Sequence, residues 1–230
     1  MPSRNIIKTN IKNGFYHIYN RGVEKRVIFE DEQDYKVFLN YLKEYLSPPI
    51  KMEGRLKTFT LKGTTFQGIP HHPKNYFLKI ELLAYCLMPN HFHLLIKQIE
   101  KGSMKDFMRS VATRYSMYFN KRYSRVGTLF QGIYKAVMIG DDNYLLHLSR
   151  YIHLNPSEYT NDLPSAYSSY ADYLGIRKTS WISTGEILSF FDKAKADFFK
   201  RTNSYKDFVE DHKADTASIL GEIVIETDDL

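Results

Sequence analysis

The sequence has almost no cysteine and no long hydrophobic run. Cys86 is the single cysteine among 230 residues, so no internal disulfide can form and no thiol cluster is available for zinc or an iron–sulfur group. No stretch reaches the roughly 20 apolar residues that cross a bilayer, and the first residues carry no apolar signal core. These absences predict a cytoplasmic protein without a membrane partner.

The overall composition is that of a folded protein. Hydrophobic residues make up 43% of the chain and charged residues 25%, which excludes a largely disordered or low-complexity chain. At 230 residues we expect one dominant core with appended segments.

Charge is distributed unevenly along the chain. The net charge is +6, but residues 97–135 hold nine basic and two acidic residues, whereas residues 207–230 hold eight acidic residues and one lysine. The basic region favours a polyanion such as nucleic acid, with an ordinary solvated helix face as the alternative. Tyrosines within it, such as Tyr115 and Tyr123, can stack on unpaired bases or serve simply as packing residues.

Hydrophobic periodicity predicts both strands and helices. Strands are expected at 15–19, 77–87, 91–97 and within 127–139. Helices are expected at 31–46, at 103–123 with Ser103 as cap, at 141–155 after a cap at Asp141 or Asp142, and near 186–200. Residues 47–76 are rich in Gly, Pro, Lys and Thr, which predicts an insertion outside the core.

Two histidines stand two residues apart on a predicted strand. His91 and His93 should therefore point to one face of the sheet while Phe92 packs into the other. Neutral imidazole is the commonest protein ligand for transition-metal ions. A lone His-x-His pair nevertheless lines a polar sheet face more often than it binds a metal, so the pattern alone leaves both interpretations open.

A tyrosine and an asparagine lie four residues apart near the end of the predicted helix at 141–155. Tyr151 and Asn155 should therefore share a helix face. A phenol oxygen can attack phosphorus when a metal withdraws charge from the phosphate, and an amide oxygen can complete the shell of that metal. Separately, Tyr151 is an ordinary packing residue and Asn155 an ordinary cap before Pro156, so the hypothesis depends on their occurring together with the histidines.

Three segments together resemble the single-tyrosine HUH transposases, and most closely the REP-associated tyrosine transposases and related small insertion-sequence enzymes. These segments are YCLMPNHFHLL at 85–95, LFQG at 129–132 and RYIHLNP at 150–156. Weaker matches lie at 16–22 and 168–170, and the resemblance extends over about residues 15–175. Each segment is short, but their combination is specific.

The resemblance implies an α+β, ferredoxin-like fold with an antiparallel sheet and helices on one face. It also implies that His91, His93 and Asn155 hold a divalent metal ion and that Tyr151 is the nucleophile. Enzymes of this family cut single-stranded DNA through a 5′-phosphotyrosine and then rejoin strands. Mg²⁺ prefers oxygen ligands and Mn²⁺ tolerates imidazole better, so a site of two histidines and one amide should accept either ion and favour Mn²⁺.

Basic residues are expected to hold the backbone of single-stranded or hairpin DNA, with ordinary surface charge as the alternative for each. They are Arg21, Lys105, Arg109, Arg114, Lys121, Arg122 and Lys135. Residues 1–175 would form the catalytic domain and 176–230 a helical extension with an acidic tail, and a homodimer is a further expectation. Two alternatives stay open, namely a domesticated nickase and a non-catalytic binder of structured nucleic acid.

Overall fold

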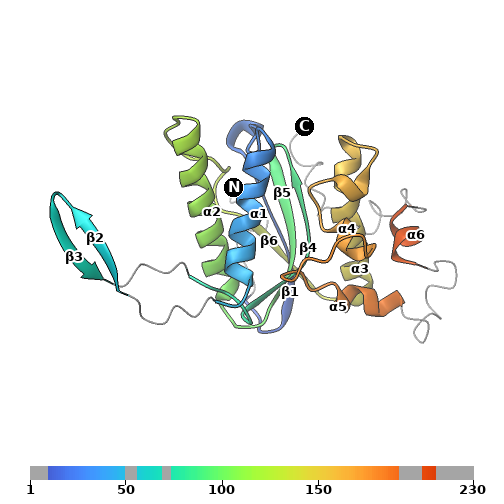
Figure 1. Ribbon diagram of the computed structural model, residues 1–230. Helices are drawn as coiled ribbons and strands as arrows, with labels where there is room; N and C mark the ends of the chain where they lie inside the picture. Colours follow the sequence, from blue (N-terminus) through green and yellow to red (C-terminus); the bar gives the residue numbers. More distant parts are fainter. Residues whose placement is uncertain (1–9, 50–55, 69–73, 192–203, 211–230) are drawn as a thin grey trace.

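A four-stranded antiparallel sheet forms the centre of the molecule (Figure 1). The computed structural model describes residues 10–49, 56–68, 74–191 and 204–210. The strands are β1 (Gly14–Arg21), β4 (Ile80–Met88), β5 (His91–Gln98) and β6 (Lys135–Ile139), in the order β4-β5-β1-β6. This arrangement confirms the predicted α+β class, although the strand expected within 127–139 is limited to its last five residues.

Helices cover both faces of this sheet. Helices α1 (Glu32–Leu46) and α2 (Ser103–Arg122) pack on one face, and α3 (Asp142–Leu154) packs on the other (Figure 1). The expectation of helices on one face alone is therefore wrong. The alternation of β5 explains the two cores, because Phe92 and Leu94 enter the core under α1 and α2 while Leu95 enters the core under α3.

The helix ends follow the sequence with one exception. Asp31 and Asp141 cap α1 and α3 by accepting hydrogen bonds from backbone N–H groups of the first turn. Ser103, in contrast, does not cap α2, because its hydroxyl donates to the backbone carbonyls of Lys79, which precedes β4, and of Glu100. The cap of α2 is Gly102, in a left-handed conformation. The last buried residue on the apolar face of α2 is Phe119, whereas Tyr118 is only partly buried.

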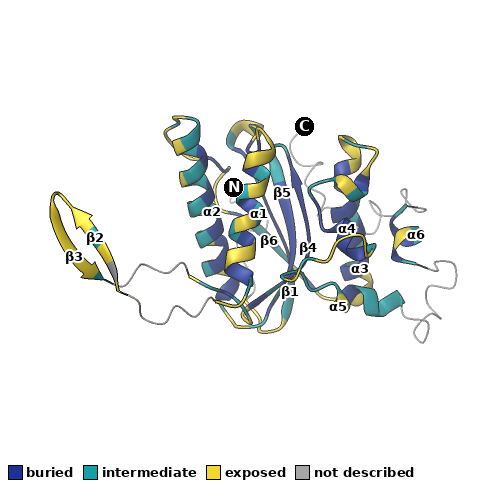
Figure 2. Ribbon diagram, in the orientation of Figure 1, coloured by how far each residue is buried: buried dark blue, intermediate teal, exposed yellow. Residues whose placement is uncertain are grey.

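A hairpin projects from the body of the molecule between α1 and β4 (Figures 1 and 2). It consists of β2 (Lys57–Leu61) and β3 (Thr64–Gly68), which pair only with each other. Its turn contains Lys62 and Gly63, both with positive φ, as a two-residue hairpin loop requires. Residues 64–67 of this hairpin are exposed, so it contributes little to the core.

Short elements near the C-terminus lie on the α3 side of the sheet. They are α4 (Tyr170–Tyr173), α5 (Gly185–Leu188) and α6 (Tyr205–Glu210). Short 3₁₀ turns are η1 (Val23–Lys25), η2 (Asn155–Glu158), η3 (Leu163–Ser165) and η4 (Ser189–Phe191). The helix expected near 186–200 is thus replaced by two short helical pieces, α5 and η4, up to residue 191. The remainder of that segment lies outside the described residues. His71 and His72 also lie outside them. Within the described ranges, every helix is too short or too polar to cross a bilayer.

Candidate active site

The two histidines of β5 lie on the sheet face that α3 covers. His93 faces Tyr19 across the β1–β5 ladder and His91 faces Arg21, so these side chains share one face near one end of the sheet. His93 is fully buried and His91 is partly buried. The period-two alternation that the sequence predicted for this pair is confirmed by the packing of Phe92 into the opposite core.

Helix α3 brings the tyrosine and the asparagine to the same place. The ring of Tyr151 lies perpendicular to that of His93, with 5.4 Å between the ring centroids. Asn155 stands at the end of α3, where its Nδ2 donates a hydrogen bond to the backbone carbonyl of Tyr151 at 2.9 Å. The structure therefore brings together the four residues His91, His93, Tyr151 and Asn155.

Burial keeps the imidazoles of this site neutral. Desolvation lowers the pKa of His91 to about 4, against a smaller opposing effect from the Asn155 side chain that contacts it. Desolvation likewise lowers the pKa of His93 well below its ordinary value, with further lowering from its two histidine neighbours. Neutral imidazoles have a lone pair for a metal ion, and protonated ones do not.

The donor atoms present fit a divalent metal ion. Within the part of the chain that the structure describes, His93 Nε2 and Asn155 Oδ1 are buried and make no hydrogen bond of normal geometry, although the Asn155 amide lies beside His91. Such atoms are costly to bury unless something else binds them. No cluster of three His, Cys, Asp or Glu side chains suited to a metal occurs among the described residues, so an amide oxygen would have to complete the set.

Sequence reasoning did not assign a role to His17, which the structure places in the same site. This histidine lies on β1, is fully buried, and has its Nε2 2.9 Å from Nδ1 of His93. Its ring centroid is 6.3 Å from that of Tyr151. Two features of the sequence could have identified His17. It is a polar ring within an otherwise apolar strand, and it belongs to the weaker family match at residues 16–22.

The basic residues predicted to bind DNA are divided between the two faces. Arg21 and Lys135 lie near the histidines, since Arg21 pairs in register with His91 and Lys135 lies over the ring of Tyr19. The other five lie on α2, across the sheet from α3. Three of these form ion pairs, namely Arg109 with Asp106, Arg114 with Glu44, and Arg122 with Asp31 and Asp34.

Comparison with known proteins agrees with this geometry. The family model described as "Transposase IS200 like" matches residues 72–155, which include both histidines of β5, Tyr151 and Asn155. Residues 72–155 belong to the IS200-like transposase family. This match confirms the resemblance drawn from the sequence, and it supports a transposase role for the chain.

Two solved structures were compared with the chain. A REP-associated tyrosine transposase bound to a REP hairpin has 12% identity and a TM-score of 0.50, over 79% of this chain and 98% of that chain. A protein of Deinococcus radiodurans R1, provisionally described as a transposase, has 13% identity and a TM-score of 0.36, over 66% and 95% of the two chains. No curated protein matches the chain. At 12% identity, the first of these similarities shows the fold alone.

Proposed function

We propose that this protein cleaves and rejoins single-stranded DNA in transposition, through a covalent 5′-phosphotyrosine at Tyr151. The observation that carries the proposal is the contact between the Tyr151 ring and His93, with Asn155 one helical turn further along α3. A phenol, two neutral imidazoles and an amide oxygen thus converge on one face of the sheet. This combination suits phosphoryl transfer to tyrosine.

In this proposal His91, His93 and Asn155 hold Mg²⁺ or Mn²⁺. When bound there, such an ion supplies Lewis-acid polarisation of the scissile phosphate. Its presence matters because the unperturbed pKa of a phenol is about 10, so Tyr151 is a poor nucleophile at neutral pH. Asn155 is oriented for this role because its Nδ2 is already bonded to the Tyr151 carbonyl, which leaves Oδ1 for the ion.

The cleavage step conserves the phosphodiester bond energy. The Tyr151 oxygen forms a bond to phosphorus, the bond between phosphorus and the 3′-oxygen breaks, and the proton lost by the phenol is balanced by the one gained by the 3′-hydroxyl. A 3′-hydroxyl of another strand end then attacks the phosphotyrosine and releases Tyr151. No ATP is needed, because the covalent link stores the energy for rejoining.

The proposed substrate is single-stranded or hairpin DNA. The similar transposase that is bound to a REP hairpin supports this choice, and so does the position of Arg21 and Lys135 beside the site. We propose that residues 1–175 form the catalytic domain, with 176–230 as an extension, in a cytoplasmic protein. All four proposed site residues come from one chain, so cleavage as proposed needs no second copy, although a homodimer stays a prediction.

The experiment that tests this function is covalent labelling. Purified protein is incubated with Mn²⁺ and a pool of labelled single-stranded hairpin oligonucleotides, and the products are separated under denaturing conditions. We expect a labelled protein band from the wild type and none from Tyr151→Phe or His91→Ala. Tyr151→Phe should still bind DNA, because it removes only the attacking oxygen.

Tyr144→Phe is the matched control, since Tyr144 lies on the same helix and is also partly buried. It should label like the wild type. Labelling that persists in Tyr151→Phe but disappears in Tyr144→Phe would move the nucleophile to Tyr144. Tight DNA binding without any adduct would favour the non-catalytic binder, and an adduct without strand joining would favour the nickase.

A further inference from the structure

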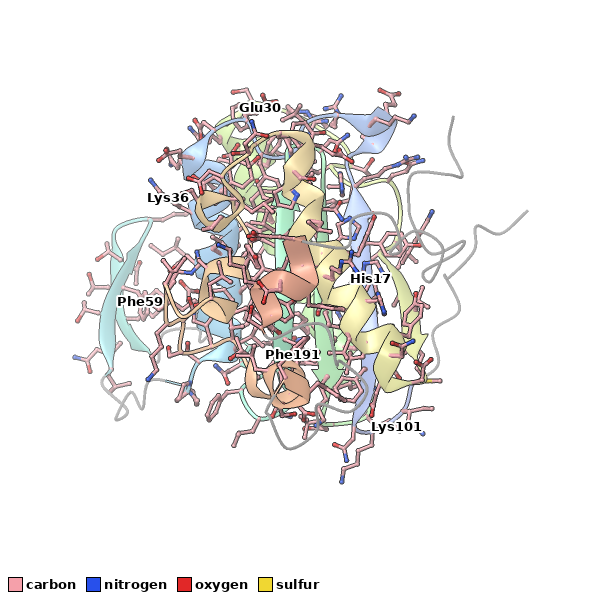
Figure 3. All side chains as sticks on the ribbon, turned by 90° about the vertical axis from the view of Figure 1, so that its right-hand side faces the viewer. His17, Glu30, Lys36, Phe59, Lys101 and Phe191 are labelled. Atoms are coloured by element: carbon pink, nitrogen blue, oxygen red, sulfur yellow. The ribbon has the colours of Figure 1, made fainter. Side chains whose placement is uncertain are left out.

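A third histidine lies behind the proposed metal ligands. His17 is on β1, and in Figure 3, which looks onto the α3 side, it lies beside that helix. Its ring is nearly parallel to that of His93, with 5.1 Å between centroids and 14° between planes, so the two rings meet through their nitrogen edges. Both side chains are fully buried. The 2.9 Å separation of His17 Nε2 and His93 Nδ1 is that of a hydrogen bond.

This hydrogen bond links the protonation patterns of the two rings. A neutral imidazole carries one N–H, and two neutral rings share a single hydrogen atom in the bond between them. If His93 Nδ1 carries the hydrogen, His93 Nε2 keeps its lone pair. If His17 Nε2 carries it instead, the hydrogen of His93 must be on its own Nε2. Only the first arrangement allows His93 Nε2 to bind a metal ion.

His17 is not a ligand itself. Its Nε2 already contacts His93 Nδ1. Its Nδ1 is buried without a hydrogen-bond partner among the described residues, as His93 Nε2 is, but those residues contain no group of three His, Cys, Asp or Glu side chains suited to a metal. The atom of His93 that is left without a hydrogen-bond partner among the described residues is Nε2. Any effect of His17 on metal binding must therefore act through His93.

We propose that His17 is a positioning residue, which accepts a hydrogen bond from His93 Nδ1–H and so fixes the tautomer in which His93 Nε2 binds the divalent ion. The inference rests on the proposed function, because it takes His93 to be a ligand. Hydrogen bonds of this kind orient a ligating imidazole and raise its basicity. Here the acceptor is another imidazole rather than the more usual carboxylate or backbone carbonyl.

Calorimetric titration of Mn²⁺ into the DNA-free protein tests the proposal. His17→Phe keeps a ring of similar size but removes the acceptor, and we expect Mn²⁺ to bind about 10- to 100-fold more weakly. His17→Gln restores an acceptor oxygen and should recover most of this loss. His153→Phe is the matched control, because His153 is also fully buried and bonded through both ring nitrogens, to Tyr205 and Ser169. It should bind Mn²⁺ as the wild type does.

A spectroscopic measurement on the wild type decides the question even if His17→Phe fails to fold. In ¹⁵N-histidine-labelled protein saturated with Zn²⁺, we expect a protonated Nδ1 and a metal-shifted Nε2 on His93, and an unprotonated Nε2 on His17. A His93 Nδ1 without a hydrogen would overturn the inference. So would a folded His17→Phe that binds Mn²⁺ with wild-type affinity.

The outcomes separate this inference from the proposed function. If Mn²⁺ binding depends on His17 but no covalent DNA adduct forms, the phosphotyrosine reaction is overturned and the positioning role stands. If the adduct forms and Mn²⁺ binding requires His91 but not His17, the positioning role alone is overturned. A wild type that binds neither Mn²⁺ nor Zn²⁺ overturns the inference together with the metal part of the proposed function.

Discussion

Two buried polar sites, one on each face of the sheet, differ in whether their atoms have hydrogen-bond partners. Under α1 and α2, the buried carboxylate of Asp34 accepts hydrogen bonds from the Glu30 backbone N–H, the Tyr118 and Tyr123 hydroxyls, and the Arg122 guanidinium. At the candidate site under α3, two buried polar atoms, His93 Nε2 and Asn155 Oδ1, have no hydrogen-bond partner among the described residues.

This difference separates a structural network from a candidate reactive one. A buried polar group that is fully bonded stabilises one arrangement of the chain, as Asp34 joins α1 to the end of α2. A buried acceptor without a partner costs free energy unless a ligand binds it. Unpartnered acceptors therefore point to function more strongly than burial or charge alone.

The largest expected effect on stability comes from the core under α1 and α2. The ring of Phe38 is fully buried and contacts Phe29, Phe92 and Tyr115. Phe38→Ala should lower the free energy of unfolding by about 3–5 kcal/mol, through lost burial and a residual cavity. Urea denaturation measures this loss, and the protein that remains folded should bind Mn²⁺ normally.

Phe66→Ala is the control for that substitution, because Phe66 lies on the projecting hairpin and is 48% exposed. It should change the unfolding free energy by about 0.5 kcal/mol or less. A loss of Mn²⁺ affinity in folded Phe38→Ala would show that packing under α1 and α2 affects the site under α3. The two faces could then not be described as one structural and one reactive face.

Sequence patterns predicted the local parts of this protein well. The period-two run around His91 and His93, the three- and four-residue spacing of α1, and the cap at Asp141 each depend on neighbours within a few residues. The pairing of Tyr151 and Asn155 on α3 is of the same kind, since one helix turn sets it.

The errors arose where distant residues decide the structure. Ser103 has the residue type of a cap, but its hydroxyl is taken by the carbonyls of Lys79 and Glu100. His17 acquires a partner only through the β1–β5 pairing, across 76 positions of sequence. Helices on both faces likewise depend on which side of the sheet α3 crosses, and periodicity within α3 does not specify that side.

Acid should act mainly on the α3 side of the molecule. Burial lowers the pKa of His17 and His153 to about 3 and that of His91 to about 4, whereas an unfolded histidine titrates near about 6.5. Between these values the unfolded chain binds more protons than the folded one. Stability is therefore full above about pH 6.5 and falls as the pH drops towards about 4, by at most about 1.4 kcal/mol per pH unit for each histidine.

Urea denaturation of the wild type and of His153→Phe across that pH range measures the effect. The variant lacks one buried histidine, so its unfolding free energy should depend on pH less steeply by about one proton. Equal slopes would mean that His153 binds a proton in the folded protein, and that the burial of this ring does not oppose its charge.

The smallest expected effect concerns DNA binding by single basic residues on the two faces. Arg21 lies opposite His91 in the β1–β5 ladder, whereas Arg109 lies on α2 in an exposed pair with Asp106. In the Tyr151→Phe background, Arg21→Ala should weaken binding of a single-stranded oligonucleotide and lower the slope of log K against log salt by about 0.7. Arg109→Ala should change neither quantity. Equal losses at both positions would mean that DNA contacts the α2 side as well, and the contrast between the faces would then apply to the chemistry alone.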